Sequence, residues 1–93
     1  MGQPRAVTPE DPRRAEVRAR IARAHGHLHG ILDMIDEGRP YEDVLQQIGA
    51  VRAALDKATA VIVDDLITSA QNAPPAKRAE KLEKVRVAVK RLA

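Results

Sequence analysis

The sequence predicts an all-α protein whose three-helix protomer is a long antiparallel helix hairpin followed by a short C-terminal helix. Apolar residues recur at intervals of three and four through most of the chain, which is the period of an amphipathic helix. No segment alternates apolar and polar residues in the way that a half-buried strand does. Proline and glycine stand where the periodic segments end, so these residues divide the chain into its helices.

The first helix is expected to end near Glu37 and to begin at one of two competing starts. Thr8-Pro9 and Asp11-Pro12 each place a capping side chain directly before a proline. Gly38 follows the helix and suits a left-handed cap. A single apolar stripe with steps of three and four is expected to face the core, and it consists of Ile21, Ala24, Leu28, Ile31, Leu32 and Ile35.

The second helix is expected to start near Pro40, with acidic residues in the first turn, where the helix dipole favours them. It ends before Asn72, because prolines follow directly after it. The helix carries an a/d seam whose members are Val44, Ile48, Val51, Leu55, Ala58, Ile62 and Leu66. The third helix is expected over about residues 76–92, with a stripe of Leu82, Val85, Val89 and Leu92.

The length of 93 residues predicts one domain over residues 10–93, preceded by a disordered arm of residues 1–9. A chain this short buries little surface by itself, and oligomerisation is a common remedy. Leu45, Val61 and Val63 lie off the main seam of the second helix and still need cover. We therefore expect a dimeric four-helix bundle, and a dimer of dimers beyond it, so that the protein is a homodimer or a homotetramer.

The composition excludes several classes of protein. There is no cysteine, which excludes a disulfide framework, a thiol nucleophile and a thiolate metal site. A single aromatic residue, Tyr41, leaves no platform for stacking single-stranded bases. The first residues do not resemble a signal peptide, and the longest apolar run, Ala58 to Val63, is too short to span a membrane. We expect a cytoplasmic protein without a membrane partner.

The net charge is +3, and its distribution is uneven. Residues 1–30 carry six arginines and three acids, residues 31–72 carry three bases and eight acids, and residues 73–93 carry seven bases and two acids. Two basic ends of this kind are typical of nucleic-acid binding. Solvated helix faces would give the same balance, so charge alone leaves both interpretations open.

Two linked motifs carry a family resemblance. The segment from Arg20 to Ile31, R-I-A-R-A-H-G-H-L-H-G-I, resembles the R-L-x-x-V-x-G-H/Q-L/V-x-G-I opening of the copper-sensing repressor (CsoR/RcnR/FrmR) family. Tyr41 and the run from Asp43 to Leu55 resemble that family's Y-C-x-D-V-L-x-Q-I-x-A-V-x-x-A-L pattern. The resemblance covers about residues 18–70. It implies an all-α dimer, usually paired into a tetramer, that binds operator DNA and releases it when an effector binds.

The resemblance also implies that basic residues of the first two helices contact DNA. Arg20 and Lys57 occupy the matching positions, and Arg23 and Arg52 lie near them in the sequence. Arginine suits phosphate contacts. The expected DNA-binding set is therefore Arg13, Arg14, Arg18, Arg20, Arg23, Arg52 and Lys57. The other interpretation of the arginine group is a solubilising face.

The positions of the family's metal site are substituted. The resemblance places Glu42 where copper sensors have a cysteine, and it places Leu66 and Ala70 where they have a histidine and a second cysteine on the partner protomer. These three residues do not provide the soft ligands that Cu(I) needs, and Glu42 also departs from the nickel, cobalt and formaldehyde branches. We expect no cofactor there. Tyr41, Glu42, Leu66 and Ala70 become the positions of an effector pocket whose ligand, a small molecule or an anion, is unknown.

Three histidines provide the remaining candidate for metal binding. His25 and His29 lie one helical turn apart, a spacing that can chelate Ni²⁺, Cu²⁺ or Zn²⁺, but two imidazoles are an incomplete shell. The alternatives are exposed polar positions, with His27 packing or hydrogen-bonding at an interface, or titration that strengthens DNA contact on acidification. For Tyr41, the hydroxyl is expected either to donate to Glu80 or Glu83 or to remain in water.

The sequence as a whole predicts an operator-binding transcriptional repressor with an unknown effector, and not an enzyme. Asp64 and Asp65 diverge on a helix, and no nucleophile is paired with a base. Two alternatives stay open. One is a helical interaction or oligomerisation protein whose basic ends are incidental, and the other is a regulator that responds to metal through His25 and His29.

Overall fold

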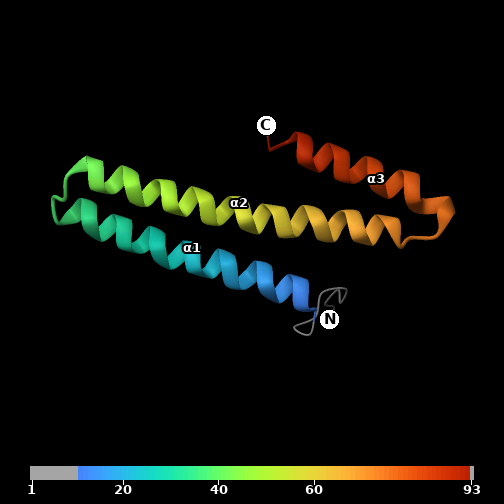
Figure 1. The fold of residues 1–93 in the computed structure, drawn as a ribbon, viewed down its shortest axis with the longest axis horizontal. Coiled ribbons are helices and arrows are strands. Elements are labelled where there is room, and N and C mark those ends of the chain that lie inside the picture. The colour runs from blue at the N-terminus through green and yellow to red at the C-terminus, as the bar shows by residue number, and fades with distance from the viewer. Residues whose placement is uncertain (1–10, 93) are drawn as a thin grey trace, which may run out of the picture. The chain divides into compact units, whose positions relative to one another are not determined.

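The computed structural model describes residues 11–92, which form three α-helices (Figure 1). These are α1 (Pro12–Asp36), α2 (Tyr41–Gln71) and α3 (Pro75–Lys90), and no strand occurs among the described residues. The predicted all-α class, with two long helices and a short third one, is confirmed. The disordered arm expected at residues 1–9 lies outside the described residues. The chain packs as two compact units, Met1–Thr59 and Ala60–Ala93, and α2 contributes to both.

The ends of α1 explain why the helix occupies these residues. The carboxylate of Asp11 accepts hydrogen bonds from the backbone N–H groups of Arg13 and Arg14, at 3.1 and 3.3 Å. Of the two competing starts, Asp11-Pro12 therefore caps the helix, and Thr8-Pro9 lies outside the described residues. At the other end, Gly38 has φ +75°, and its N–H donates to the carbonyl of Ile35 at 3.0 Å. A residue without a Cβ adopts this left-handed conformation at little cost.

Helices α2 and α3 begin and end at or near the residues that the sequence predicts. Helix α2 has 31 residues, with Glu42 and Asp43 in its first turn, and it ends at Gln71, as predicted. Helix α3 begins at Pro75, since proline is tolerated in the first turn of a helix, and it ends at Lys90. The predicted range of about 76–92 was thus close, but two residues too long at its C-terminal end.

The first unit has its core between α1 and α2. Ala24 and Ile31 of α1 form one buried cluster with Val44 and Val51 of α2, and Met34 packs against it. Because α1 and α2 are antiparallel and His27 contacts Gln47, Ala24 lies at about the level of Val51, and Ile31 at about the level of Val44. Only part of each predicted stripe is therefore buried within the protomer. The other stripe residues are exposed within one protomer, in agreement with the expectation that the hairpin alone cannot cover all of its apolar side chains.

The other members of the stripes form a second, exposed stripe on each helix, displaced by one residue from the first. One residue corresponds to a rotation of about 100°. Because α1 and α2 are antiparallel, this rotation turns both second stripes to the same side of the hairpin. That side presents large apolar side chains that are 38% to 74% exposed, and we call it the hairpin apolar face: Ile21, Leu28, Leu32, Ile35, Tyr41, Leu45, Ile48 and Leu55.

The second unit has small buried residues. Ala70, Ala73 and Val85 are its buried apolar side chains, whereas Leu82 and Val89 of the predicted α3 stripe remain 40% exposed. No helix within residues 11–92 is both long and apolar enough to cross a membrane.

Candidate nucleic-acid interface and effector positions

The candidate arginines of α1 do not gather on one face of the helix. At about 100° per residue, Arg14 and Arg18 lie beside the hairpin apolar face, whereas Arg23 lies on the opposite side of the hairpin. Arg13 and Arg20 lie near the side that faces α2, and both are half-buried. The structure thus divides the predicted basic surface into parts with different surroundings.

One part is a small cluster on the side opposite the hairpin apolar face. Arg23 of α1 and Lys57 of α2 project from that side, and Arg20, half-buried near the side that faces α2, lies between them along the hairpin; we call the three residues the outer basic cluster. The contact between His27 and Gln47 fixes the register of the two helices. In this register the three residues fall within about 9 Å along the hairpin axis. Arg20 and Lys57, which the family pattern selects, are therefore within about one helical turn of each other along the hairpin axis.

An acidic neighbour partly neutralises this cluster. Arg20 donates two hydrogen bonds to one carboxylate oxygen of Glu16, at 3.2 Å from Nε and 3.1 Å from Nη2. The two side chains are 32% and 43% exposed, so the pair is screened by water and is worth little in free energy. Arg23 and Lys57 are exposed. A phosphate could therefore replace Glu16 as the partner of Arg20 at small cost.

Arg52 does not share this surface with Lys57. The two residues are five positions apart in α2, which corresponds to about 140° of rotation. Arg52 lies beside the hairpin apolar face, on the same side as Arg14 and Arg18. The sequence placed Arg52 and Lys57 together because both lie on one helix, but the backbone turns them to different sides of the hairpin.

The histidines have different environments. His27 Nε2 lies 2.6 Å from Oε1 of Gln47, which joins α1 to α2 through a half-buried hydrogen bond. His25 is exposed, and His29 lies with Nδ1 3.7 Å from a carboxylate oxygen of Asp33. Within residues 11–92 of one protomer, no three histidine or acidic side chains are grouped so as to hold a metal ion. The expectation that His27 hydrogen-bonds at a helix interface is confirmed.

The expected effector positions lie at both ends of α2. Tyr41 and Glu42 belong to its first turn, where Tyr41 is 74% exposed. Leu66 and Ala70 belong to its last two turns, where Leu66 is 39% exposed and Ala70 is buried. The two acceptors proposed for Tyr41 have partners on their own helix. Glu80 lies 3.9 Å from Lys84, and Glu83 accepts two hydrogen bonds from Arg86.

Comparison with known proteins decides the family. A family model described as a metal-sensitive transcriptional repressor matches residues 13–91. The chain belongs to this family. The solved structure of the nickel-responsive transcriptional regulator InrS is similar in fold, with a TM-score of 0.75. That match has 28% sequence identity and covers 96% of this chain and 100% of the InrS chain. A search of curated proteins gave no match.

The donors of this member do not fit a thiolate metal site. Cysteine is absent from the whole sequence. The positions that resemble the copper ligands supply one carboxylate, from Glu42, and two hydrocarbon side chains, from Leu66 and Ala70. Cu(I) favours thiolates, thioethers and imidazoles, so these residues cannot replace the copper ligands. Membership of a metal-sensitive repressor family therefore does not by itself provide this chain with a copper site.

The need to cover Leu45 was predicted from the sequence, but the composition of the hairpin apolar face across both helices was not. Adjacent pairs of large apolar residues, such as Ile31 with Leu32 and Val44 with Leu45, marked it in the sequence. Two neighbouring residues cannot both face one partner helix, because they differ by about 100°. Each pair therefore indicated two contact surfaces, of which only one is filled within the protomer.

Proposed function

We propose that this protein represses transcription by binding duplex operator DNA as a homo-oligomer, with Arg20, Arg23 and Lys57 as its main phosphate contacts on the hairpin. One observation supports the proposal: Arg23 and Lys57 are exposed on the side of the hairpin opposite the hairpin apolar face, and Arg20 lies at the border of that side. A dimer that forms through the apolar face therefore leaves the outer basic cluster in solvent, where a polyanion can reach it.

The occupant proposed for the hairpin apolar face is a second copy of the same hairpin. Large apolar side chains such as Leu32 and Leu45, 60% and 67% exposed in the protomer, need cover in a protein this small. A two-fold axis brings the same face of each copy together, and four antiparallel helices then enclose one core. Pairing of two such dimers would give the tetramer. The proposal rests on the large apolar side chains that remain exposed within the first unit.

The mode of DNA recognition would rest on phosphate contacts and duplex shape. The chain has a single aromatic residue. Lysine and arginine contacts to phosphate position a protein on the duplex and release counterions, so affinity falls steeply with salt. Arg14, Arg18 and Arg52 would lie at the rim of the dimer interface and add to the positive potential. Arg13, beside the N-terminal cap of α1, completes the predicted set.

The effector of this repressor would differ from cuprous ion. Glu42, Leu66 and Ala70 support this part of the proposal, since none is a soft ligand. A regulator that responds to Ni²⁺, Cu²⁺ or Zn²⁺ through His25 and His29 would need further ligands, from a partner protomer or from water. Both imidazoles are exposed and therefore accessible to such an ion, although Nδ1 of His29 lies 3.7 Å from a carboxylate oxygen of Asp33, and the pair alone is not a complete site.

The test of DNA binding measures affinity for the duplex upstream of the protein's own gene by fluorescence anisotropy, at several salt concentrations. Arg20→Ala and Lys57→Ala should each weaken binding and leave the oligomer unchanged. Arg86→Ala is the control, because it removes one exposed cation that is paired with Glu83 on α3. If both cluster variants bind as tightly as the parent protein, the outer basic cluster is not the DNA surface. If the parent protein does not bind duplex DNA at low salt, the repressor proposal is wrong.

A further inference from the structure

Helix α3 carries a line of cations that the DNA surface described above does not include. Lys77, Lys81, Lys84 and Arg91 are separated by steps of four, three and seven residues. At about 100° per residue, all four fall within an arc of about 80° on one side of the helix. At about 1.5 Å per residue, the line is about 21 Å long. We call these four residues the α3 basic stripe.

Little negative charge opposes the stripe. Lys84 makes one long ion pair, with Nζ 3.9 Å from a carboxylate oxygen of Glu80, and the two side chains are 76% and 65% exposed. Among residues 11–92, Lys77, Lys81 and Arg91 have no hydrogen bond or ion pair made by their side chains. All four residues are exposed. The stripe is therefore a surface of positive charge that is available to an anionic partner.

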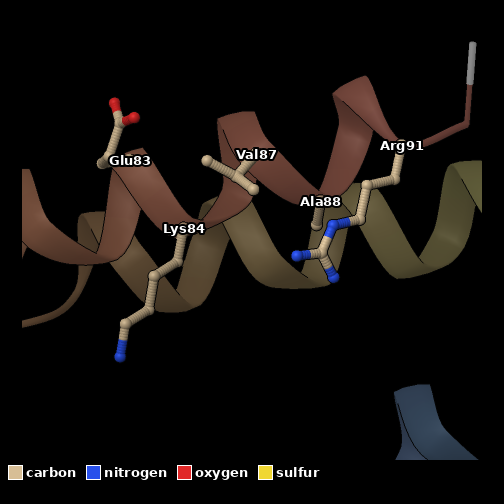
Figure 2. A pocket seen from close by; sticks show the side chains of 5 residues that line it. All are labelled: Glu83, Lys84, Val87, Ala88 and Arg91. Carbon is tan, nitrogen blue, oxygen red and sulfur yellow. The ribbon is translucent and has the colours of Figure 1, made fainter.

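The other cations of α3 lie elsewhere and are engaged differently. Arg86 donates hydrogen bonds to both carboxylate oxygens of Glu83, at 3.0 and 2.6 Å. Arg78 donates to the carbonyl of Ala73 at 3.4 Å. Figure 2 shows Lys84 and Arg91 extending from the side of α3 that bears Ala88, whereas Glu83 points to the other side. Helix α3 therefore has a basic side with one long ion pair, between Lys84 and Glu80, and another side on which Glu83 and Arg86 are closely paired.

The small side chain of Ala88 shapes the middle of this surface. An open depression of about 300 Å³ is lined by Glu83, Lys84, Val87, Ala88 and Arg91 (Figure 2). Lys84 and Arg91 are two helical turns apart, about 10.5 Å, with Ala88 between them. No polar or charged side chain is buried in the described chain, so the depression has no fixed donor that would select a small anion. Glu83 also lines the depression, so the depression by itself selects no anion.

We propose that the α3 basic stripe is a second surface that binds the phosphate backbone of duplex DNA, in addition to the outer basic cluster. This inference rests on the proposed repressor function and extends it to a helix outside the hairpin. A duplex presents one negative charge per about 1.7 Å of its axis, so a line of cations about 21 Å long can meet several phosphates at once. Long, exposed lysine and arginine side chains suit contacts that do not depend on base sequence.

A lipid surface is the competing partner for a basic helix. Helices that lie in a membrane interface insert an apolar side between lipid headgroups, with basic residues at its border. The apolar side of α3 includes Val85, which is buried within the second unit at 9% exposure. Leu82 and Val89 are 40% exposed, but burial of Val85 holds this side within the second unit and prevents its insertion as one continuous apolar side. Duplex DNA is therefore the better match to the stripe.

The experiment compares two double variants of the full chain. K84Q/R91Q removes one lysine and one arginine from the stripe, and R86Q/K90Q removes one of each from the remainder of α3. Each pair also breaks one ion pair, with Glu80 or with Glu83. The measurement is the slope of the logarithm of the DNA-binding constant against the logarithm of salt concentration. Circular dichroism and sedimentation show whether each variant keeps its helices and its oligomeric state.

We expect K84Q/R91Q to make the slope shallower by about 0.9 for every phosphate contact that is lost, and R86Q/K90Q to leave it unchanged. Equal slopes in both variants and the parent would overturn the inference, while the effects of Arg20→Ala and Lys57→Ala would still support the repressor proposal. An equal loss in both variants would also overturn it, because net charge would then explain the effect. If only binding to phosphatidylserine vesicles responds to K84Q/R91Q, the stripe is a lipid surface instead.

Discussion

His27 Nε2 and Gln47 Oε1 lie 2.6 Å apart and join α1 to α2 between two apolar layers of the hairpin. Ile31 and Val44 lie in the layer toward the turn, and Ala24 and Val51 lie in the other layer. A polar pair at this place fixes the register of the helices, because displacement of one helix by a turn would separate the two groups. The same register places Arg20 and Lys57 within about one helical turn of each other along the hairpin axis.

Gln47→Ala should therefore lower the free energy of unfolding by about 1 kcal/mol, which is typical for loss of a hydrogen bond that is partly shielded from water. Denaturation in urea measures the change. Gln46→Ala is the matched control, because Gln46 is exposed and is its direct neighbour on the same helix. The control should stay within about 0.5 kcal/mol of the parent. Equal effects of the two substitutions would show that the contact with His27 does not stabilise the hairpin.

Much of the fold was readable from local features. The Asp11-Pro12 start, the Gly38 cap and the prolines after Asn72 each act through the backbone of their own residues, so the helix limits could be predicted. Which half of the α2 seam is buried in the protomer could not be predicted, since Val51 and Leu55 are equally apolar. Their difference, 4% against 38% exposed, depends on the position of α1.

The candidate site was predictable only residue by residue. The family pattern selected Arg20 and Lys57, but how close they lie along the hairpin axis depends on the pairing of α1 with α2. The α3 basic stripe could have been found from its spacing alone, since a repeat of cations every three or four residues marks one side of a helix. The charge count for residues 73–93 did not reveal the stripe, because it combined Lys77, Lys81 and Arg91 with Arg86, which is closely paired with Glu83.

The hairpin apolar face makes a prediction about assembly. Leu28→Asp places a carboxylate in the centre of that face, where Leu28 is 46% exposed in the protomer. Burial of an unpaired charge between two copies would cost several kcal/mol, so we expect sedimentation to show monomers and DNA affinity to fall with them. Ala22→Asp adds the same charge on an exposed position directed away from this face, and it should leave the oligomer intact. A stable oligomer of Leu28→Asp would show that the copies associate through another surface.

The pair of Glu83 with Arg86 predicts a pH dependence. Hydrogen bonding from Arg86 lowers the pKa of the Glu83 carboxyl below its ordinary value in the folded chain, with the nearby positive charge acting in the same direction. A carboxyl of this kind stabilises the fold above the pKa that it has in the unfolded chain. This contribution is lost as the pH falls through the lower pKa of the folded state.

Glu83→Gln should therefore reduce the acid dependence of unfolding below about pH 4.5, the ordinary pKa of this carboxyl, with a small effect because both side chains are exposed. Urea denaturation between pH 3 and pH 7 measures the dependence. Glu42→Gln, which removes an exposed carboxyl from the first turn of α2, serves for comparison. If the unfolding free energies of the parent and Glu83→Gln change with pH in the same way, the pair of Glu83 with Arg86 does not contribute to stability in acid.

Restoring the family's ligands would test whether the altered positions still surround a site. The triple substitution E42C/L66H/A70C returns two thiols and an imidazole to positions that the resemblance assigns to the copper ligands. If two protomers bring these positions together, the variant should bind Cu(I) tightly, since thiolates and imidazole are suitable ligands for this ion. Competition with a chromophoric Cu(I) chelator measures the affinity.

The parent should fail to compete, because Met1 and Met34 are its only sulfur donors. The partial variant E42C should compete weakly, and equal competition by E42C and the triple variant would show that Leu66 and Ala70 do not lie beside Glu42 in the assembled protein.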